Sequence, residues 1–161
     1  MTDEMNQFFT RPQANAGIRV PLKHPVTGAD TGHWLQVLGQ DSDAFREEEE
    51  ASRRRIQDAL AALPASQRNA AKYIEIIKAT KTEEKLSGVA SLVSNWSFVE
   101  PCTRENVTAW LREAPQIQDA IDLAAGDRSL FLASVASSST DTQKQSSSST
   151  ESQPEAPQTN P

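Results

Sequence analysis

Two stretches near the start of the chain carry apolar residues in patterns typical of β-strands. Residues 18–22, IRVPL, place apolar side chains at every second position, the period of a half-buried strand, and Pro21 restricts that strand to the edge of a sheet. Residues 34–38 form an apolar run that Gly39 ends. The Pro- and Gly-containing segment between them predicts a loop of about ten residues in an antiparallel hairpin, whose apolar face needs a helix to cover it.

Helical spacing begins directly after this hairpin. Asp41 or Ser42 can cap a helix, and Asp43 adds negative charge to its first turn. Apolar residues then recur at helical intervals as far as Leu63, and Pro64 is a plausible stop. We therefore expect a helix over residues 42–63.

The middle of this helix, FREEEEASRRRI, is almost entirely charged. Glu49 precedes Arg53 by four residues, and Glu50 precedes Arg54 by four, which is the favourable order for ion pairs along a helix. We favour a solvated face of ion pairs here. The sharper hypothesis makes Arg53, Arg54 and Arg55 a docking patch for an acidic partner. The adjacent glutamates argue against a phosphate site, because they cancel the local positive field.

Residues 67–81 carry a broad apolar stripe that predicts a second helix or the end of a longer one. Thr82, followed by two glutamates, predicts the start of a third helix that runs into the segment SNWSF. We expect Trp96 and Phe98 at its end to be core residues, because large aromatic side chains usually serve packing there.

Two further helices follow a turn. Thr103 is placed to cap the first of them, and Pro115 separates it from a second over residues 116–125, which Gly126 ends. Asp127 can then cap a last helical turn.

Together these elements predict an α+β fold that is predominantly α-helical, with an N-terminal β-hairpin packed on a bundle of about five helices. We expect one domain over residues 17–133. Residues 1–16 are predicted to be an N-terminal arm whose Phe8 and Phe9 dock on the body or on a partner, with the body favoured. Residues 134–161 are rich in Ser, Thr, Gln and Pro and predict a disordered tail, because they cannot bury enough apolar surface to order the chain.

Composition narrows the class of protein. The chain has 161 residues and a net charge of −6, which disfavours a nucleic-acid partner, since the overall field repels phosphate. No apolar run approaches the roughly 20 residues of a membrane span, and acidic residues stand where a signal peptide carries positive charge. We therefore expect a cytoplasmic protein with no membrane partner. The single cysteine, Cys102, excludes an intrachain disulfide.

Residues capable of catalysis or metal binding are few. His24 and His33 flank the hairpin loop with Asp30 between them, but two histidines supply half of a tetrahedral site. Cys102 has no histidine near it in sequence, so we expect a partly buried, unreactive thiol. The segment GADTG lacks the lysine and length of a phosphate-binding loop. We expect a non-enzymatic protein with no catalytic residue, cofactor or metal.

The order of these signals resembles the tail assembly chaperones of long, flexible-tailed (siphovirus-like) bacteriophages. The similar segments are HPVTGADTGHWLQVLGQDSDAF, the charged helix ending in RRRI, LVSNW before a proline-containing turn, and ENVTAWLREAPQIQDAIDLAAGDRSLF. They cover residues 19–131. His24 and Val26 depart from the acidic or small polar residues expected of that family, and the Ser-rich tail has no counterpart in the resemblance.

The resemblance implies that the chain binds the tape measure protein in the host cytoplasm. It would keep that protein soluble until tail tube subunits polymerise around it, and would be absent from the mature virion. The tail tube protein is a second candidate partner, and the chain is also a candidate homo-oligomer. The alternatives are a structural virion component, such as a head-tail connector or minor tail protein, and a DNA-binding regulator that uses residues 53–55, which the net charge disfavours.

Overall fold

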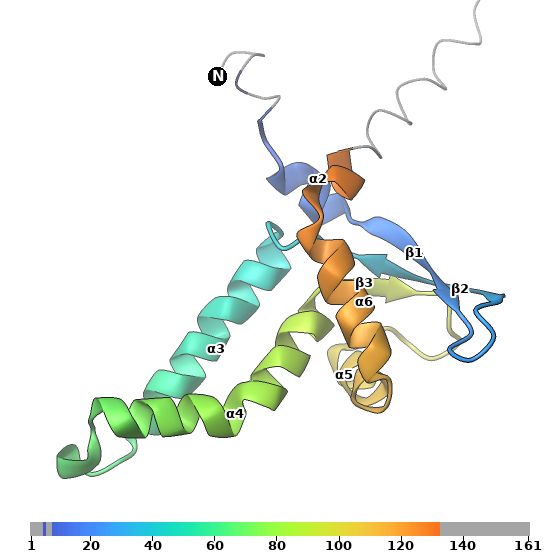
Figure 1. Cartoon of the computed structure of the whole chain (residues 1–161). Coiled ribbons are helices and arrows are strands. Elements are labelled where there is room, and N and C mark those ends of the chain that lie inside the picture. Colours follow the sequence, from blue (N-terminus) through green and yellow to red (C-terminus); the bar gives the residue numbers. More distant parts are fainter. Residues whose placement is uncertain (1–4, 6–7, 133–161) are drawn as a thin grey trace, which may run out of the picture.

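The centre of the fold is a three-stranded antiparallel sheet in the order β1 (Ile18–Lys23), β2 (Asp30–Val37) and β3 (Val93–Trp96). The computed structural model describes Met5 and residues 8–132 (Figure 1). The hairpin and the edge position of the Pro21 strand are confirmed. The expected disordered tail, residues 134–161, lies outside the described residues.

The hairpin loop is shorter than the pattern predicted. β2 begins at Asp30, before the apolar run, so only residues 24–29 form the loop in place of about ten. Backbone and hydroxyl hydrogen bonds carry the pairing into this polar stretch: His24 N donates to Ala29 O at 2.8 Å, and Thr31 Oγ1 donates to Leu22 O at 2.5 Å. Polar side chains there face water, so hydrophobic alternation could not mark the start of the strand.

The third strand corrects the prediction of a helix running into SNWSF. Helix α4 (Ala70–Ser91) ends first, and β3 pairs with the free edge of β2. Val93 and Trp96 are buried while Ser94 and Asn95 between them are exposed. The strand forms because β2 offers unpaired backbone groups along its edge, a long-range cause that helical spacing cannot reveal. Trp96 and Phe98 do pack with the core, as expected.

The predicted helix starts agree with the structure at Ser42 and Thr103. Ser42 Oγ accepts a hydrogen bond from Phe45 N at 3.4 Å, and Thr103 Oγ1 accepts one from Asn106 N at 3.3 Å. Asp127 accepts from the backbone and hydroxyl of Ser129, where residues 128–132 are helical. The remaining helices of the described chain are α2 (Arg11–Ala16), α3 (Asp43–Ala61), the short 3-10 helix η1 (Ala65–Gln67), α5 (Arg104–Glu113) and α6 (Pro115–Gly126).

The helix start predicted at Thr82 is wrong, because α4 is one continuous helix of 22 residues. Its N-terminal cap is Asn69, whose side chain accepts from Lys72 N at 3.0 Å. Thr82 follows more than three turns of α4, which begins at Ala70, so its backbone N–H already has an acceptor within the helix and needs no cap.

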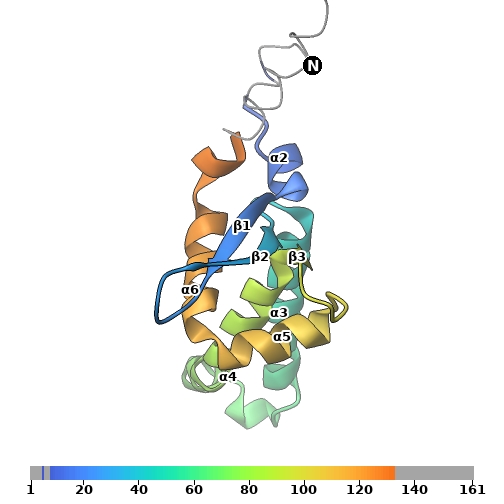
Figure 2. The ribbon, with the colours of Figure 1, turned by 90° about the vertical axis from the view of Figure 1, so that its right-hand side faces the viewer.

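The core lies where the sheet meets the C-terminal half of α4, α5 and α6 (Figures 1 and 2). Figure 2 shows α5 running across the lower end of α6. The largest fully buried apolar side chains are Leu35, Val37, Leu92, Val107, Leu111 and Ile121. In the described part of the chain, no helix has the length and apolar character needed to cross a membrane.

Helix α2 and the last described turn are fastened to the start of α3. Asp41 accepts two hydrogen bonds from Arg128, at 2.7 and 3.0 Å, and one from Thr10 at 3.0 Å. The Arg128 hydrogen bonds lower the pKa of Asp41 to about 2, against a smaller opposing effect of burial. Ala14 packs on Gly39, so residues 11–16 of the expected arm form a helix on the body.

Candidate partner-binding surface

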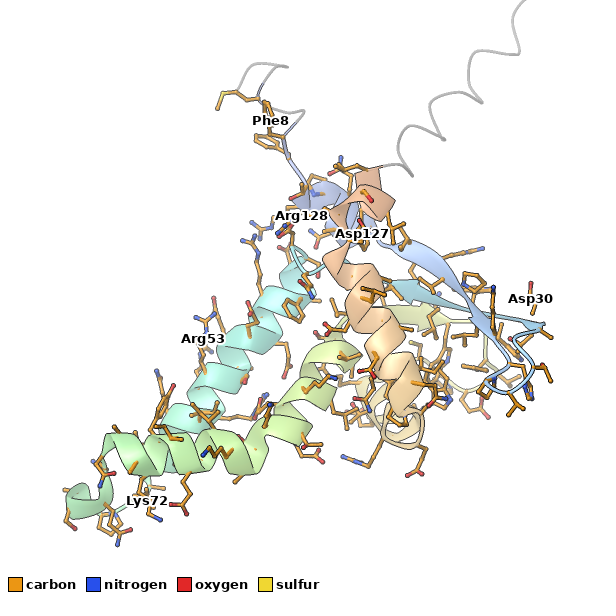
Figure 3. The ribbon with its side chains drawn as sticks, in the orientation of Figure 1. Phe8, Asp30, Arg53, Lys72, Asp127 and Arg128 are labelled. Atoms are coloured by element: carbon orange, nitrogen blue, oxygen red, sulfur yellow. The ribbon has the colours of Figure 1, made fainter. Side chains whose placement is uncertain are left out.

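Helices α3 and α4 form an antiparallel hairpin that extends away from the sheet (Figures 1 and 3). No residue of α3 is buried, and the buried residues of α4 begin only at Leu86. We call residues 53–81 the distal hairpin. Its two helices contact each other but no described element closes over them, so it has no core of its own.

Three large side chains on the first half of α4 are exposed next to one another. Tyr73, Ile74 and Ile77 are 42%, 51% and 37% exposed, and they lie one, three and four positions apart on the helix. We call them the α4 apolar patch. Single exposed apolar residues are ordinary, whereas neighbouring ones on a free helix face make this patch the candidate partner-binding surface.

Charge is unevenly divided between the distal hairpin and the rest of the chain. Residues 53–81 hold seven Lys or Arg residues against two acidic ones, but the three arginines at 53–55 are paired with glutamates outside this range. Without them, residues 56–81 carry a net charge of +2, in a protein whose net charge is −6. Lys78 and Lys81, which follow the α4 apolar patch, make no ion pair with any described residue. The face that carries the patch is therefore basic, although the whole protein is acidic.

The side chains of Arg53 and Arg54 are 69% and 73% exposed, and Figure 3 shows Arg53 directed away from α4. Both expected ion pairs form: Arg53 Nη2 is 4.0 Å from Glu49 Oε2, and Arg54 Nη2 is 3.2 Å from Glu50 Oε2. Their positive charges are thus partly compensated along α3 itself.

Arg55 is separated from these two by its role inside the hairpin. It donates to Glu84 through Nε at 3.1 Å and Nη2 at 2.5 Å, and to Glu48 at 2.8 Å. Glu48 also accepts from Ser87 Oγ at 2.7 Å and pairs with Arg104 at 2.6 Å. This five-residue network links α3, α4 and α5 at the root of the hairpin. Arg53, Arg54 and Arg55 therefore do not form a single free patch.

The network lowers the pKa of both of its carboxylates, Glu48 and Glu84. Burial alone would raise the pKa of Glu48, but hydrogen bonds from Ser87 and Arg55 and the charge of Arg104 outweigh it, so the pKa is lowered. Hydrogen bonding from Arg55 likewise lowers the pKa of Glu84. Both glutamates are held ionised at neutral pH.

Phe8 and Phe9 lie elsewhere. Phe8 is 77% exposed and Phe9 39% exposed, and Figure 3 places Phe8 at the opposite end of the molecule from Lys72. The five residues predicted to bind a partner are thus spread over separate places in the fold.

Comparison with known proteins adds no family to this picture. No protein-family model matches the chain. Neither a curated protein nor a solved structure matches it.

The two histidines, His24 and His33, are hydrogen-bonded within the fold. His24 Nδ1 accepts from Val26 N and Thr27 N at 3.3 Å each, and His33 Nδ1 is 3.1 Å from Ser97 Oγ. Within residues 8–132 and Met5, no group of three potential ligands is arranged to hold a metal ion. Burial raises the pKa of the Cys102 thiol, which disfavours the reactive thiolate.

Trp96, Phe98 and Trp110 border a surface hollow of about 300 Å³. Their rings pack edge to face with centroids 5.3 to 5.9 Å apart, and Trp96 Nε1 donates to Glu100 O at 2.6 Å. The three aromatic side chains therefore pack against one another and against the core.

The sequence contains a signal for the α4 apolar patch that the assignment of one buried helix face does not use. Between Ala70 and Ile77, six of eight positions are apolar, more than one face of a helix can hold. Because the distal hairpin has only one packing partner per helix, the surplus apolar positions face solvent.

Proposed function

We propose that this protein is a phage tail assembly chaperone, a non-enzymatic binding protein that keeps the tape measure protein soluble in the host cytoplasm and is left out of the mature virion. The observation that carries the proposal is the distal hairpin, which extends from the body with an uncovered apolar patch. The ordered segments that resemble this family, over residues 19–131, give the proposal its partner.

The geometry suits the masking of an amphipathic helix. A helical hairpin can accept a third helix along its open face, and such recognition uses apolar anchors at positions i, i+3, i+4 and i+7. The α4 apolar patch comprises only three side chains, which favours a modest contact area and rapid release. Reversible binding is needed if tail tube subunits are to displace the chaperone as they assemble.

Co-expression with the tape measure protein of the same phage tests this function. With a tag on this chain, we expect the tape measure protein to become soluble and to co-purify. The control is expression of the tape measure protein with an unrelated acidic protein of similar size. If the tape measure protein stays insoluble and unbound while this chain is folded, the proposal is wrong.

Purified virions separate the chaperone from a structural component. A chaperone is missing from the particles, whereas a head-tail connector or minor tail protein is present at fixed stoichiometry. Quantitative mass spectrometry of purified particles makes this distinction.

A further inference from the structure

We propose that the distal hairpin binds an acidic amphipathic helix, with the α4 apolar patch holding its apolar side and Lys78 and Lys81 pairing with its carboxylates. The inference rests on the proposed function, because it specifies the kind of tape measure segment that the chaperone recognises. It also assigns the contact to α4, in place of the arginines of α3.

The binding face follows from the helix period. Ile74, Ile77, Lys78 and Lys81 stand at positions i, i+3, i+4 and i+7, so they share one face over about 10 Å, or two turns. Tyr73 borders this face one position before Ile74. The face is therefore an apolar stripe that ends in two lysines, and both lysines lack a partner among the described residues.

Charge complementarity selects the occupant. Lys78 and Lys81 make no ion pair with a described residue, so a segment with carboxylates beside its apolar stripe is attracted to this face and a basic segment is repelled. A second copy docked face to face would bring Lys78 and Lys81 of one copy close to the same lysines of the other, which disfavours a symmetric dimer through this face.

Two observations favour a protein helix over a nucleic acid. The centre of the basic face is occupied by Tyr73, Ile74 and Ile77, whereas a phosphate backbone is bound by cationic and hydrogen-bonding groups. Arg55, whose guanidinium could otherwise contact phosphate, is held by Glu48 and Glu84.

The test measures binding of fluorescent peptides to the full chain by anisotropy. The main probe is a designed helix of about five turns with leucines at i, i+3, i+4 and i+7 and flanking glutamates. The matched probes are the same helix with lysine in place of glutamate, an acidic peptide of identical composition with a scrambled order, and a short DNA duplex. We expect the acidic amphipathic helix to bind tightest of the four.

Matched variants locate the contact. Lys78→Glu with Lys81→Glu should weaken binding of the acidic helix by about tenfold at low salt, because two attractive contacts become repulsive. Arg53→Glu with Arg54→Glu changes the net charge equally and should weaken binding less than about threefold, since only the general field changes.

The apolar contact has its own matched pair. Ile74→Ser with Ile77→Ser should weaken binding by about tenfold, whereas Leu123→Ser, at a 78% exposed apolar residue of α6, should leave it unchanged. Circular dichroism checks that each variant is folded. If the isoleucine pair does not fold, the lysine and arginine pairs still decide the question.

Four outcomes of the peptide-binding measurements would overturn the inference. These are equal binding of the lysine-containing helix, equal binding of the scrambled peptide, tighter binding of the DNA, and equal losses from the two charge reversals. Self-association of the chain that the isoleucine pair abolishes in sedimentation equilibrium would also overturn it, because the face would then belong to a second copy.

The same variants in the co-expression assay separate this inference from the proposed function. Solubilisation of the tape measure protein that survives both the lysine and the isoleucine pairs rejects this surface but leaves the chaperone function standing. Specific binding of the acidic helix without any solubilisation of the tape measure protein supports this surface and rejects the chaperone function.

Discussion

Replacing Arg55 with alanine should destabilise the protein, although its neighbour Arg54 can be replaced almost without effect. Arg55 donates to both oxygens of Glu84 and to Glu48, and it joins α3 to α4. Arg54 makes one contact, with Glu50 on its own helix, and is 73% exposed. The two arginines are adjacent in sequence, so the comparison isolates the effect of the network.

The expected magnitude follows from the exposure of the partners. The side chains of Glu48 and Glu84 are only 15% and 18% exposed, so their carboxylates lose a partner in a poorly solvated place. Arg55 itself is 46% exposed, which reduces the loss through screening by water. We expect Arg55→Ala to lower the free energy of unfolding by about 1 to 2 kcal/mol, and Arg54→Ala by less than about 0.5 kcal/mol.

Urea unfolding followed by circular dichroism at pH 7 measures both values. Arg55→Lys should recover less than half of the lost stability, because an ammonium group cannot form the two-pronged contact with Glu84. A double-mutant cycle of Arg55→Ala with Glu84→Ala should give a coupling free energy of about 1 kcal/mol. Equal losses of unfolding free energy for Arg54→Ala and Arg55→Ala, together with a coupling free energy near zero, would refute the structural role of Arg55. Arg55 would then be a solvated residue available to a docking patch.

Three further predictions concern the body of the protein. Gly39→Ala should destabilise by about 1 to 3 kcal/mol in urea unfolding and make α2 more accessible to protease, because the new Cβ would lie 2.8 Å from Ala14 Cβ. Leu111→Ala, at a fully buried position, should lower the unfolding midpoint in urea with a loss of about 2 to 5 kcal/mol. Asp41 has its pKa lowered from 3.8 to about 2, so its contribution is present above pH 4 and is lost as the pH falls towards 2. Asp41→Asn should accordingly flatten the acid limb of the stability profile by about 1 to 2 kcal/mol, measured as urea midpoints at successive pH values.

Features that depend on neighbouring residues could be predicted from the sequence. The caps at Ser42 and Thr103 need only one side-chain oxygen and a backbone N–H three residues later, so local composition identifies them. The hairpin and the edge position of Pro21 follow from alternation and from the missing N–H of proline. The caps span three residues, and the hairpin joins two strands that follow each other in the sequence, which is why pattern and structure agree.

Features that depend on distant residues could not be predicted. β3 exists because β2 has an edge to pair, and residues 93–96 carry no strong local signal for a strand. The sequence does hold a signal for the role of Arg55. It lies seven residues after Glu48, and therefore on the side of α3 that meets α4. A run of three arginines suggests a common role, but consecutive residues on a helix point in different directions.

The division of the hairpin into a fastened root and an open end also explains why stability and binding should respond to different substitutions. Glu48, Arg55 and Glu84 hold the root through contacts between helices, whereas the three side chains of the α4 apolar patch are between 37% and 51% exposed. Ile74, which is 51% exposed, therefore loses the least native packing of the three when it is replaced. We propose that the exposed isoleucines of α4 are apolar because a partner covers them.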